Sequence, residues 1–127
     1  MKRKPTDARK RRQLARLVSL ADLHAEAGRA RLAAALAAER QADAEFGALQ
    51  DARTQALGRL AGDPPPEAPL ITATARWLRW QEGRMRDHAI ELARMKAETA
   101  TVRGVAGTAI ARREVLRRLL RQTRGDR

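Results

Sequence analysis

The chain has 127 residues, no cysteine, and 27 Lys and Arg against 15 Asp and Glu, which gives a formal net charge of +12. Two Trp, one Phe and no Tyr argue against a thick globular core, because large rings normally supply much of the area that such a core buries. The composition also excludes a disulfide scaffold and a cysteine zinc site, and no apolar run approaches the roughly 20 residues that span a bilayer.

The first residues are basic rather than apolar. Met1-Lys2-Arg3-Lys4 resembles the opening of a signal peptide, but five of the six residues at positions 7–12 are charged, where the apolar region of such a peptide would lie. We therefore expect a cytoplasmic protein whose basic termini are frayed.

The segment between Pro5 and Pro64 contains no proline and carries a heptad repeat. Counting from Leu14 in alternating intervals of four and three residues gives apolar or small residues for more than six heptads. The only charged residues at these positions are Glu39 and Arg53. A 3.5-residue repeat of that length is typical of a coiled coil, so we predict a helix over about residues 8–61 in which the two charged positions set the register. The predicted seam positions are Leu14, Val18, Ala21, Ala25, Gly28, Leu32, Ala35, Glu39, Ala42, Phe46, Leu49, Arg53, Ala56 and Leu60.

Four of the five prolines gather between Pro64 and Pro69. Proline removes a backbone donor and clashes with the preceding turn, so this cluster predicts a loop over residues 62–70. A loop of that length joins its two flanking helices as an antiparallel pair.

A second heptad repeat follows the loop and predicts a helix over about residues 71–122, with Thr72 or Thr74 as its N-cap. Arg113 is its only permanently charged seam position. The predicted seam positions are Ile71, Thr74, Leu78, Gln81, Met85, His88, Leu92, Met95, Thr99, Val102, Ala106, Ala109, Arg113, Leu116 and Leu120.

Together these elements predict one all-α domain, residues 1–127, folded as two long helices in an antiparallel coiled-coil hairpin. Pairing about the loop gives partner numbers that sum to about 131, so that Ala25 faces Ala106. The seam far from the loop holds small residues, which bury little area, and we expect that half to be less stable and more dependent on a partner. Gly104 and Gly107 lie in this half and indicate either close helix packing or a hinge.

The excess positive charge lies at the two ends of the sequence. Residues 1–20 hold eight basic residues and one acidic residue, and residues 103–127 hold eight Arg and two acidic residues, whereas residues 21–102 have a net charge of −1. A hairpin brings both ends together into a cationic tip that attracts an acidic protein cavity, anionic lipid or nucleic acid. The candidate partner-binding residues of this tip are Arg9, Arg12, Arg16, Arg112, Arg113, Arg117 and Arg118.

A second candidate surface lies near the loop. Trp77 and Trp80 flank the seam position Leu78, so both rings cannot be fully buried between two helices. Trp77 packs against the loop and Leu60, or the two rings form a partner-binding patch that Met85 extends.

Catalytic chemistry finds little support in the sequence. Ser19 is the only serine, no glycine-rich phosphate loop occurs, and His24 and His88 lie far apart in the predicted pairing. His88 and Glu91 have a spacing that suits a metal, but further ligands are missing, and pairing of His88 with an acidic residue across the seam is the simpler interpretation. We therefore expect no enzyme activity, no cofactor and no metal site.

The plan of the chain resembles the flagellar export stalk protein (FliJ) family and its counterpart in virulence type III secretion. The likeness lies in the order of basic N-terminus, long helix, Pro/Gly break, long helix and Arg-rich end, and in the Trp-x-x-Trp-Gln start of the second helix in residues 76–81. The resemblance implies a cytoplasmic stalk, peripheral to the inner-membrane export apparatus, that couples ATP hydrolysis to export without chemistry of its own. It also implies that the cationic tip inserts into the hexameric export ATPase, that Trp77 and Trp80 contact the export gate, and that export chaperones bind.

Two other functions remain open at this point. The net charge of +12 would bind phosphate in a nucleic-acid- or ribosome-associated protein, although no aromatic stacking platform lies near the basic ends. The amphipathic basic stretch over residues 111–122 would suit a membrane-surface coiled-coil adaptor.

Overall fold

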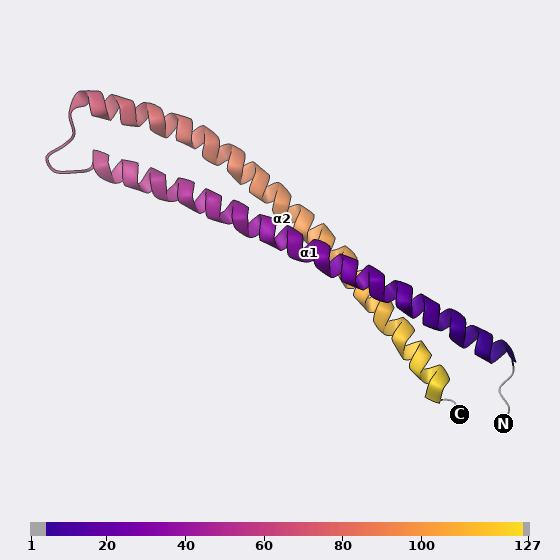
Figure 1. Cartoon of the computed structure of the whole chain (residues 1–127). Coiled ribbons are helices and arrows are strands. Elements are labelled where there is room, and N and C mark those ends of the chain that lie inside the picture. Colours follow the sequence, from indigo (N-terminus) through magenta and orange to yellow (C-terminus); the bar gives the residue numbers. More distant parts are fainter. Residues whose placement is uncertain (1–4, 126–127) are drawn as a thin grey trace. The chain divides into compact units, whose positions relative to one another are not determined.

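The computed structural model describes residues 5–125, which form two long helices, α1 (Pro5–Leu60) and α2 (Ala68–Gly125), joined by a short loop (Figure 1). The helices pack against each other as an antiparallel pair, and the described residues include no strand. This confirms the predicted all-α hairpin. In the described part of the chain, neither helix contains a stretch long and apolar enough to cross a membrane.

α1 begins three residues before its predicted start and ends one residue before its predicted end, whereas α2 extends beyond its predicted limits at both ends. The carbonyl of Glu67 accepts hydrogen bonds from the backbone N–H of Leu70 at 3.0 Å and of Ile71 at 3.1 Å, so α2 starts within the proline-rich stretch. Pro69 fits there because the N–H that proline lacks has no partner in a first helical turn. The predicted N-cap is therefore wrong: Thr72 lies inside the helix, where its hydroxyl donates to the carbonyl of Ala68 at 3.1 Å. Residues 1–4 and 126–127 of the expected frayed termini lie outside the described residues.

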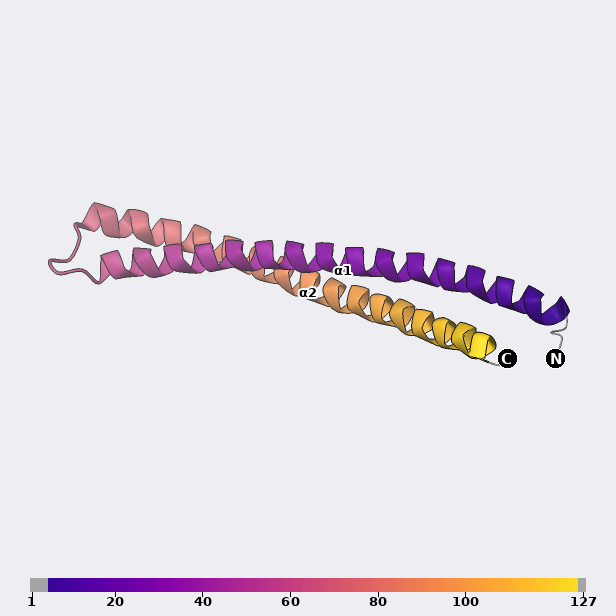
Figure 2. The same ribbon diagram turned by 60° about the horizontal axis from the view of Figure 1, so that its bottom comes forward.

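The chain divides into two compact units, each containing part of both helices. Unit 1 comprises Met1–Ala35 and Thr99–Arg127, and unit 2 is the continuous segment Leu36–Glu98. Within unit 1, the first part of α1 and the last part of α2 run beside each other in opposite directions (Figure 2).

The predicted seam accounts for the buried side of both helices. Of its positions, only Arg53 and Ile71 are exposed, and the others are buried or half-buried. Every fully buried residue in the described chain is a seam residue, namely Ala25, Gly28, Ala56, Gln81, Thr99, Ala106 and Arg113. The expectation that Arg53 sets the register from within the seam is wrong, because its guanidinium lies at the edge, 4.0 Å from Glu82.

A buried amide ties the two helices of unit 2 together. The side chain of Gln81 is 1% exposed, and its Nε2 donates a hydrogen bond of 2.7 Å to the backbone carbonyl of Leu49. This pair agrees with the predicted pairing about the loop. Because a buried amide without a partner is costly, the bond favours one register over its neighbours.

The helices of unit 1 come very close at Gly28. A Cβ placed on Gly28 would lie 3.1 Å from Cα and 3.3 Å from Cβ of Ala106, which is tighter than ordinary van der Waals contact. The predicted partner of Ala106 is Ala25, which is also buried and lies three residues before Gly28 on the same seam.

Gly104 and Gly107 do not serve close packing. A Cβ added to either one meets nothing within 4 Å, so the prediction of close helix packing at these two positions is wrong. Both glycines lie within unit 1, and the close approach there depends on Gly28 instead.

Candidate partner-binding surfaces

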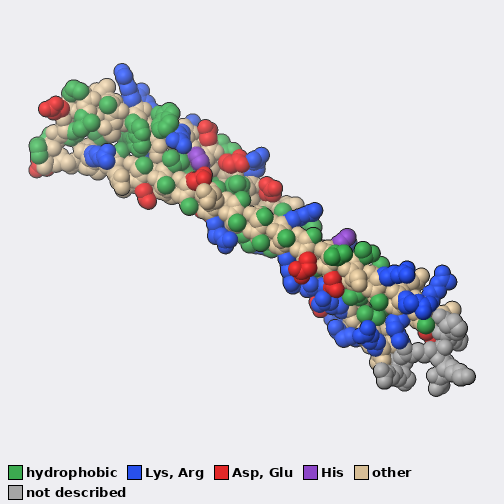
Figure 3. Space-filling view, in the orientation of Figure 1, with side chains coloured by type: hydrophobic (Ala, Val, Ile, Leu, Met, Phe, Trp, Pro, Cys, Tyr) green, Lys and Arg blue, Asp and Glu red, His purple; other side chains and the backbone are tan. Residues whose placement is uncertain are grey.

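The whole net positive charge of the chain belongs to unit 1. Its two segments hold eighteen basic and five acidic residues, a formal charge of +13, whereas unit 2 holds nine basic and ten acidic residues, a charge of −1. Lys and Arg side chains accordingly crowd the part of the molecule where α1 begins and α2 ends (Figure 3). Such a concentration repels itself and attracts acidic partners over a distance of about 8–10 Å at physiological salt.

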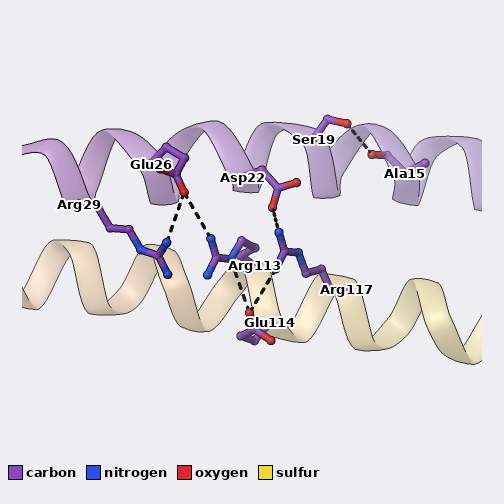
Figure 4. Close-up of polar contacts among 8 residues, drawn as sticks. All are labelled: Ala15, Ser19, Asp22, Glu26, Arg29, Arg113, Glu114 and Arg117. Carbon is purple, nitrogen blue, oxygen red and sulfur yellow. Dashed lines mark hydrogen bonds and ion pairs between the residues drawn. The ribbon is translucent and has the colours of Figure 1, made fainter.

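Arg113 does not belong to the accessible part of this charge. The residue is 6% exposed, with Nη1 3.9 Å from Glu26 and Nε 3.5 Å from Glu114 (Figure 4). Its buried Nε makes no hydrogen bond, so these contacts are ionic only. Arg113 is therefore inaccessible to a partner in this hairpin, because its seam position buries the guanidinium between the helices.

Arg117 is also engaged within unit 1. Its Nη2 donates to Oδ1 of Asp22 at 2.8 Å, and its Nη1 lies 3.6 Å from Glu114 (Figure 4). The side chains of Arg117 and Asp22 are both 39% exposed, so solvent weakens the pair without removing it. A partner of Arg117 would have to compete with the two carboxylates.

The other five predicted arginines of the cationic tip remain accessible. They are exposed, and in the part of the chain that the structure describes none lies within ion-pair distance of a carboxylate. The guanidinium groups are therefore available for bidentate contacts with carboxylates or phosphates. These residues are Arg9, Arg12, Arg16, Arg112 and Arg118.

The two tryptophans of unit 2 have different surroundings. Trp80 is 55% exposed, and the guanidinium carbon of Arg84 lies 4.9 Å from the centroid of its ring. Trp77 is half-buried and lines a shallow hollow of about 450 Å³ together with Ala56 and Arg59 of α1. Trp80 is therefore the accessible ring, while Trp77 is half-buried beside the seam and Met85 is half-buried at a seam position.

An apolar groove in unit 1 was not predicted. It has a volume of about 840 Å³ and lies between the first part of α1 and the last part of α2. Its signal was nevertheless present in the sequence, since Leu17, Leu20 and Val105 are apolar residues that each precede a seam position by one. The lining residues are Leu17, Leu20, Ala21, His24, Ala27, Gly28, Arg31, Ala100, Thr101, Gly104, Val105, Thr108, Ala109, Arg112 and Leu116.

The polar side chains considered for chemistry make local contacts. Ser19 donates its hydroxyl to the carbonyl of Ala15 at 3.2 Å, and Glu91 accepts a hydrogen bond of 2.6 Å from Arg94. This bond raises the pKa of Arg94 above its usual value. No group of three His, Cys, Asp or Glu residues suited to a metal ion occurs between residues 5 and 125.

No protein family, curated protein or solved structure matches this chain. The basis for a functional assignment is therefore the charge, the exposed side chains and the groove. All three are features of the surface.

Proposed function

We propose that the protein is a non-enzymatic coiled-coil stalk that couples a hexameric export ATPase to an export gate in a flagellar or type III secretion system. The observation that carries the proposal is the division of charge, with +13 on unit 1 and −1 on unit 2. A stalk needs one part that binds strongly to the ATPase and another part that does not compete for the same site on the ATPase.

Unit 1 is the part proposed to enter the ATPase ring. Exposed arginines on both helices would meet acidic side chains on the wall of the ring, where a surrounding low-dielectric protein strengthens each contact. Arg113 lies buried in the seam and Arg117 pairs with Asp22 on the other helix, so neither is proposed to touch the ring.

Unit 2 is the part proposed to contact the export gate. Its accessible aromatic surface centres on Trp80, whose ring and the adjacent Arg84 offer an apolar face and a cation together. Trp and Arg are the residues most enriched at binding hot spots. The protein would thus be cytoplasmic, peripheral to the membrane through its partners, and able to receive export chaperones.

A charge-reversal experiment tests the ATPase contact. Purified protein should stimulate the ATPase in proportion to its amount, and Arg9→Glu/Arg12→Glu/Arg16→Glu should abolish both the stimulation and co-precipitation. The matched control reverses three exposed basic residues of unit 2, Arg40, Arg86 and Lys96, with the same change in net charge. Failure of the wild type to stimulate the ATPase, or equal loss in both triple variants, would exclude the proposal.

Binding to nucleic acid is the second candidate, because the same +13 of unit 1 would neutralise phosphates. A salt titration with duplex and single-stranded oligonucleotides distinguishes the two functions. Nucleic-acid binding predicts an affinity that falls steeply between about 50 and 200 mM salt, and the absence of any complex at the lower concentration excludes it.

A further inference from the structure

A second line of side chains runs beside the seam in unit 1. On both helices these residues each precede a seam position by one, and together they line the groove. The line is made of Leu17, Leu20, His24, Ala27 and Arg31 on α1, and of Thr101, Val105, Thr108 and Arg112 on α2. A helix with two adjacent stripes of this kind can pack against two neighbours at once, although unit 1 supplies only one.

The groove is lined by exposed apolar side chains and by small residues. Leu20 is 54% and Val105 57% exposed, and neither has a partner helix to cover it. Ala27, Gly28 and Gly104 lie among the smaller lining residues, and a Cβ on Gly104 would meet nothing within 4 Å. Small residues of this kind let another helix approach closely, at an interaxial distance of about 8 Å.

We propose that this groove binds an acidic amphipathic helix of a partner protein, which completes a local three-helix bundle. The lining of α1 runs from Leu17 to Arg31, about 21 Å or four turns of helix. Its charged residues are Arg31 and Arg112, and no acidic residue lines the groove. A partner helix with apolar residues at heptad positions and Glu or Asp beside them matches both features.

The charge of unit 1 and the form of the groove decide against two other occupants. A second copy of this chain would bring another unit of formal charge +13 against the first. An anionic bilayer offers the right charge, but a broad lipid surface does not enter a hollow between two helices as a single helix does. The proposal does not depend on the export function and holds for any acidic helical partner.

The binding experiment uses a designed peptide of about 21 residues, with Leu and Ala at heptad positions and Glu at the flanking positions. One control peptide has Lys in place of every Glu, and the other keeps the composition but disperses the Leu residues. We expect the Glu peptide to bind one to one in titration calorimetry, at least about tenfold more tightly than either control. No binding at about 1 mM peptide, or equal binding of a control peptide, overturns the proposal.

Two matched pairs of variants locate the binding. Gly104→Glu fills the groove with a carboxylate, whereas Gly107→Glu makes the same change at a position equally open but outside the lining. Leu20→Gln removes an apolar wall, whereas Leu23→Gln alters a residue that is 66% exposed and outside the groove. The groove variants should lose about tenfold or more in affinity and the controls less than about twofold, with thermal unfolding of all four close to that of the wild type.

The same variants test the excluded occupants. Sedimentation with phosphatidylglycerol vesicles should respond equally to Gly104→Glu and Gly107→Glu, since both change the net charge by the same amount. A specific loss of vesicle binding in Gly104→Glu would make the groove a lipid site and overturn the proposal. A wild-type dimer in sedimentation equilibrium that dissociates only in Gly104→Glu would likewise assign the groove to self-association.

Discussion

Substitution of three glycines by alanine should distinguish two effects on the free energy of unfolding. One is the steric cost where the helices of unit 1 come close, and the other is the gain from the higher helix propensity of alanine. Gly28→Ala, Gly104→Ala and Gly107→Ala make the same chemical change within one unit. In a helix interior, this change stabilises by about 1 kcal/mol. Gly104 and Gly107 should realise that gain in full, because an added Cβ meets nothing within 4 Å at either position.

Gly28→Ala adds the same gain and a steric cost. Its Cβ would lie 3.1 Å from the Ala106 Cα and 3.3 Å from the Ala106 Cβ, inside the optimal carbon separation of about 3.5–4.0 Å. Backbone atoms must move by a few tenths of an ångström, and overpacking of this kind costs about 1–3 kcal/mol. We therefore expect a net change between zero and about 2 kcal/mol of destabilisation, clearly apart from the other two variants.

Urea unfolding followed by circular dichroism measures the three free energies of unfolding under one condition. The m-values should match, which shows that the variants expose similar area on unfolding. Stabilisation of Gly28→Ala by the same amount as Gly104→Ala would refute the close approach of the helices at Ala106. Destabilisation by all three would instead refute the open surroundings of Gly104 and Gly107.

Three further predictions follow from buried and half-buried polar groups. Gln81→Ala should lower the free energy of unfolding by about 1–3 kcal/mol, measured in urea, because it removes the hydrogen bond to Leu49 and leaves a void. Arg113→Met should leave the melting temperature unchanged or raise it, since a buried charge with only long ionic contacts gives way to an apolar chain of similar length. Asp22→Asn should cost less than about 1 kcal/mol at 0.15 M salt and should strengthen binding of acidic partners by freeing Arg117, which pulldown of the partner checks.

The repeat in the sequence predicted which residues of each helix are buried, and pairing about the loop placed Gln81 beside Leu49, but neither predicted how closely the helices approach farther from the loop. The spacing of apolar residues along one helix predicts that Ala25, Gln81 and Arg113 are buried. That prediction is the same for every way of sliding one helix along the other. The contact of Gly28 with Ala106 depends on how closely two particular backbones approach, which the repeat does not contain. Ion pairs across the seam depend on the offset of one helix along the other, so the engagement of Arg117 by Asp22 could not be predicted either.

The candidate surfaces differ in how far the sequence anticipated them. The concentration of charge follows from counting residues once a hairpin is assumed, and it needs no detail of packing. The groove required a different question, namely which apolar residues lie beside the seam rather than in it. Leu17, Leu20 and Val105 answer that question, because their exposure has no explanation within a two-helix pair.

The division of the chain has a consequence for the order in which it folds. Unit 2 is one continuous segment whose helices pair across a short loop, whereas unit 1 joins segments separated by the whole of Leu36–Glu98. Contacts of low contact order form first, so the seam should close from the loop outward, and amide hydrogen exchange should be fastest in unit 1. The exposed arginines and the groove would thus lie in the part that we expect to open most readily. A partner that binds to unit 1 would stabilise the state in which its two helices are paired, and would slow amide hydrogen exchange in unit 1.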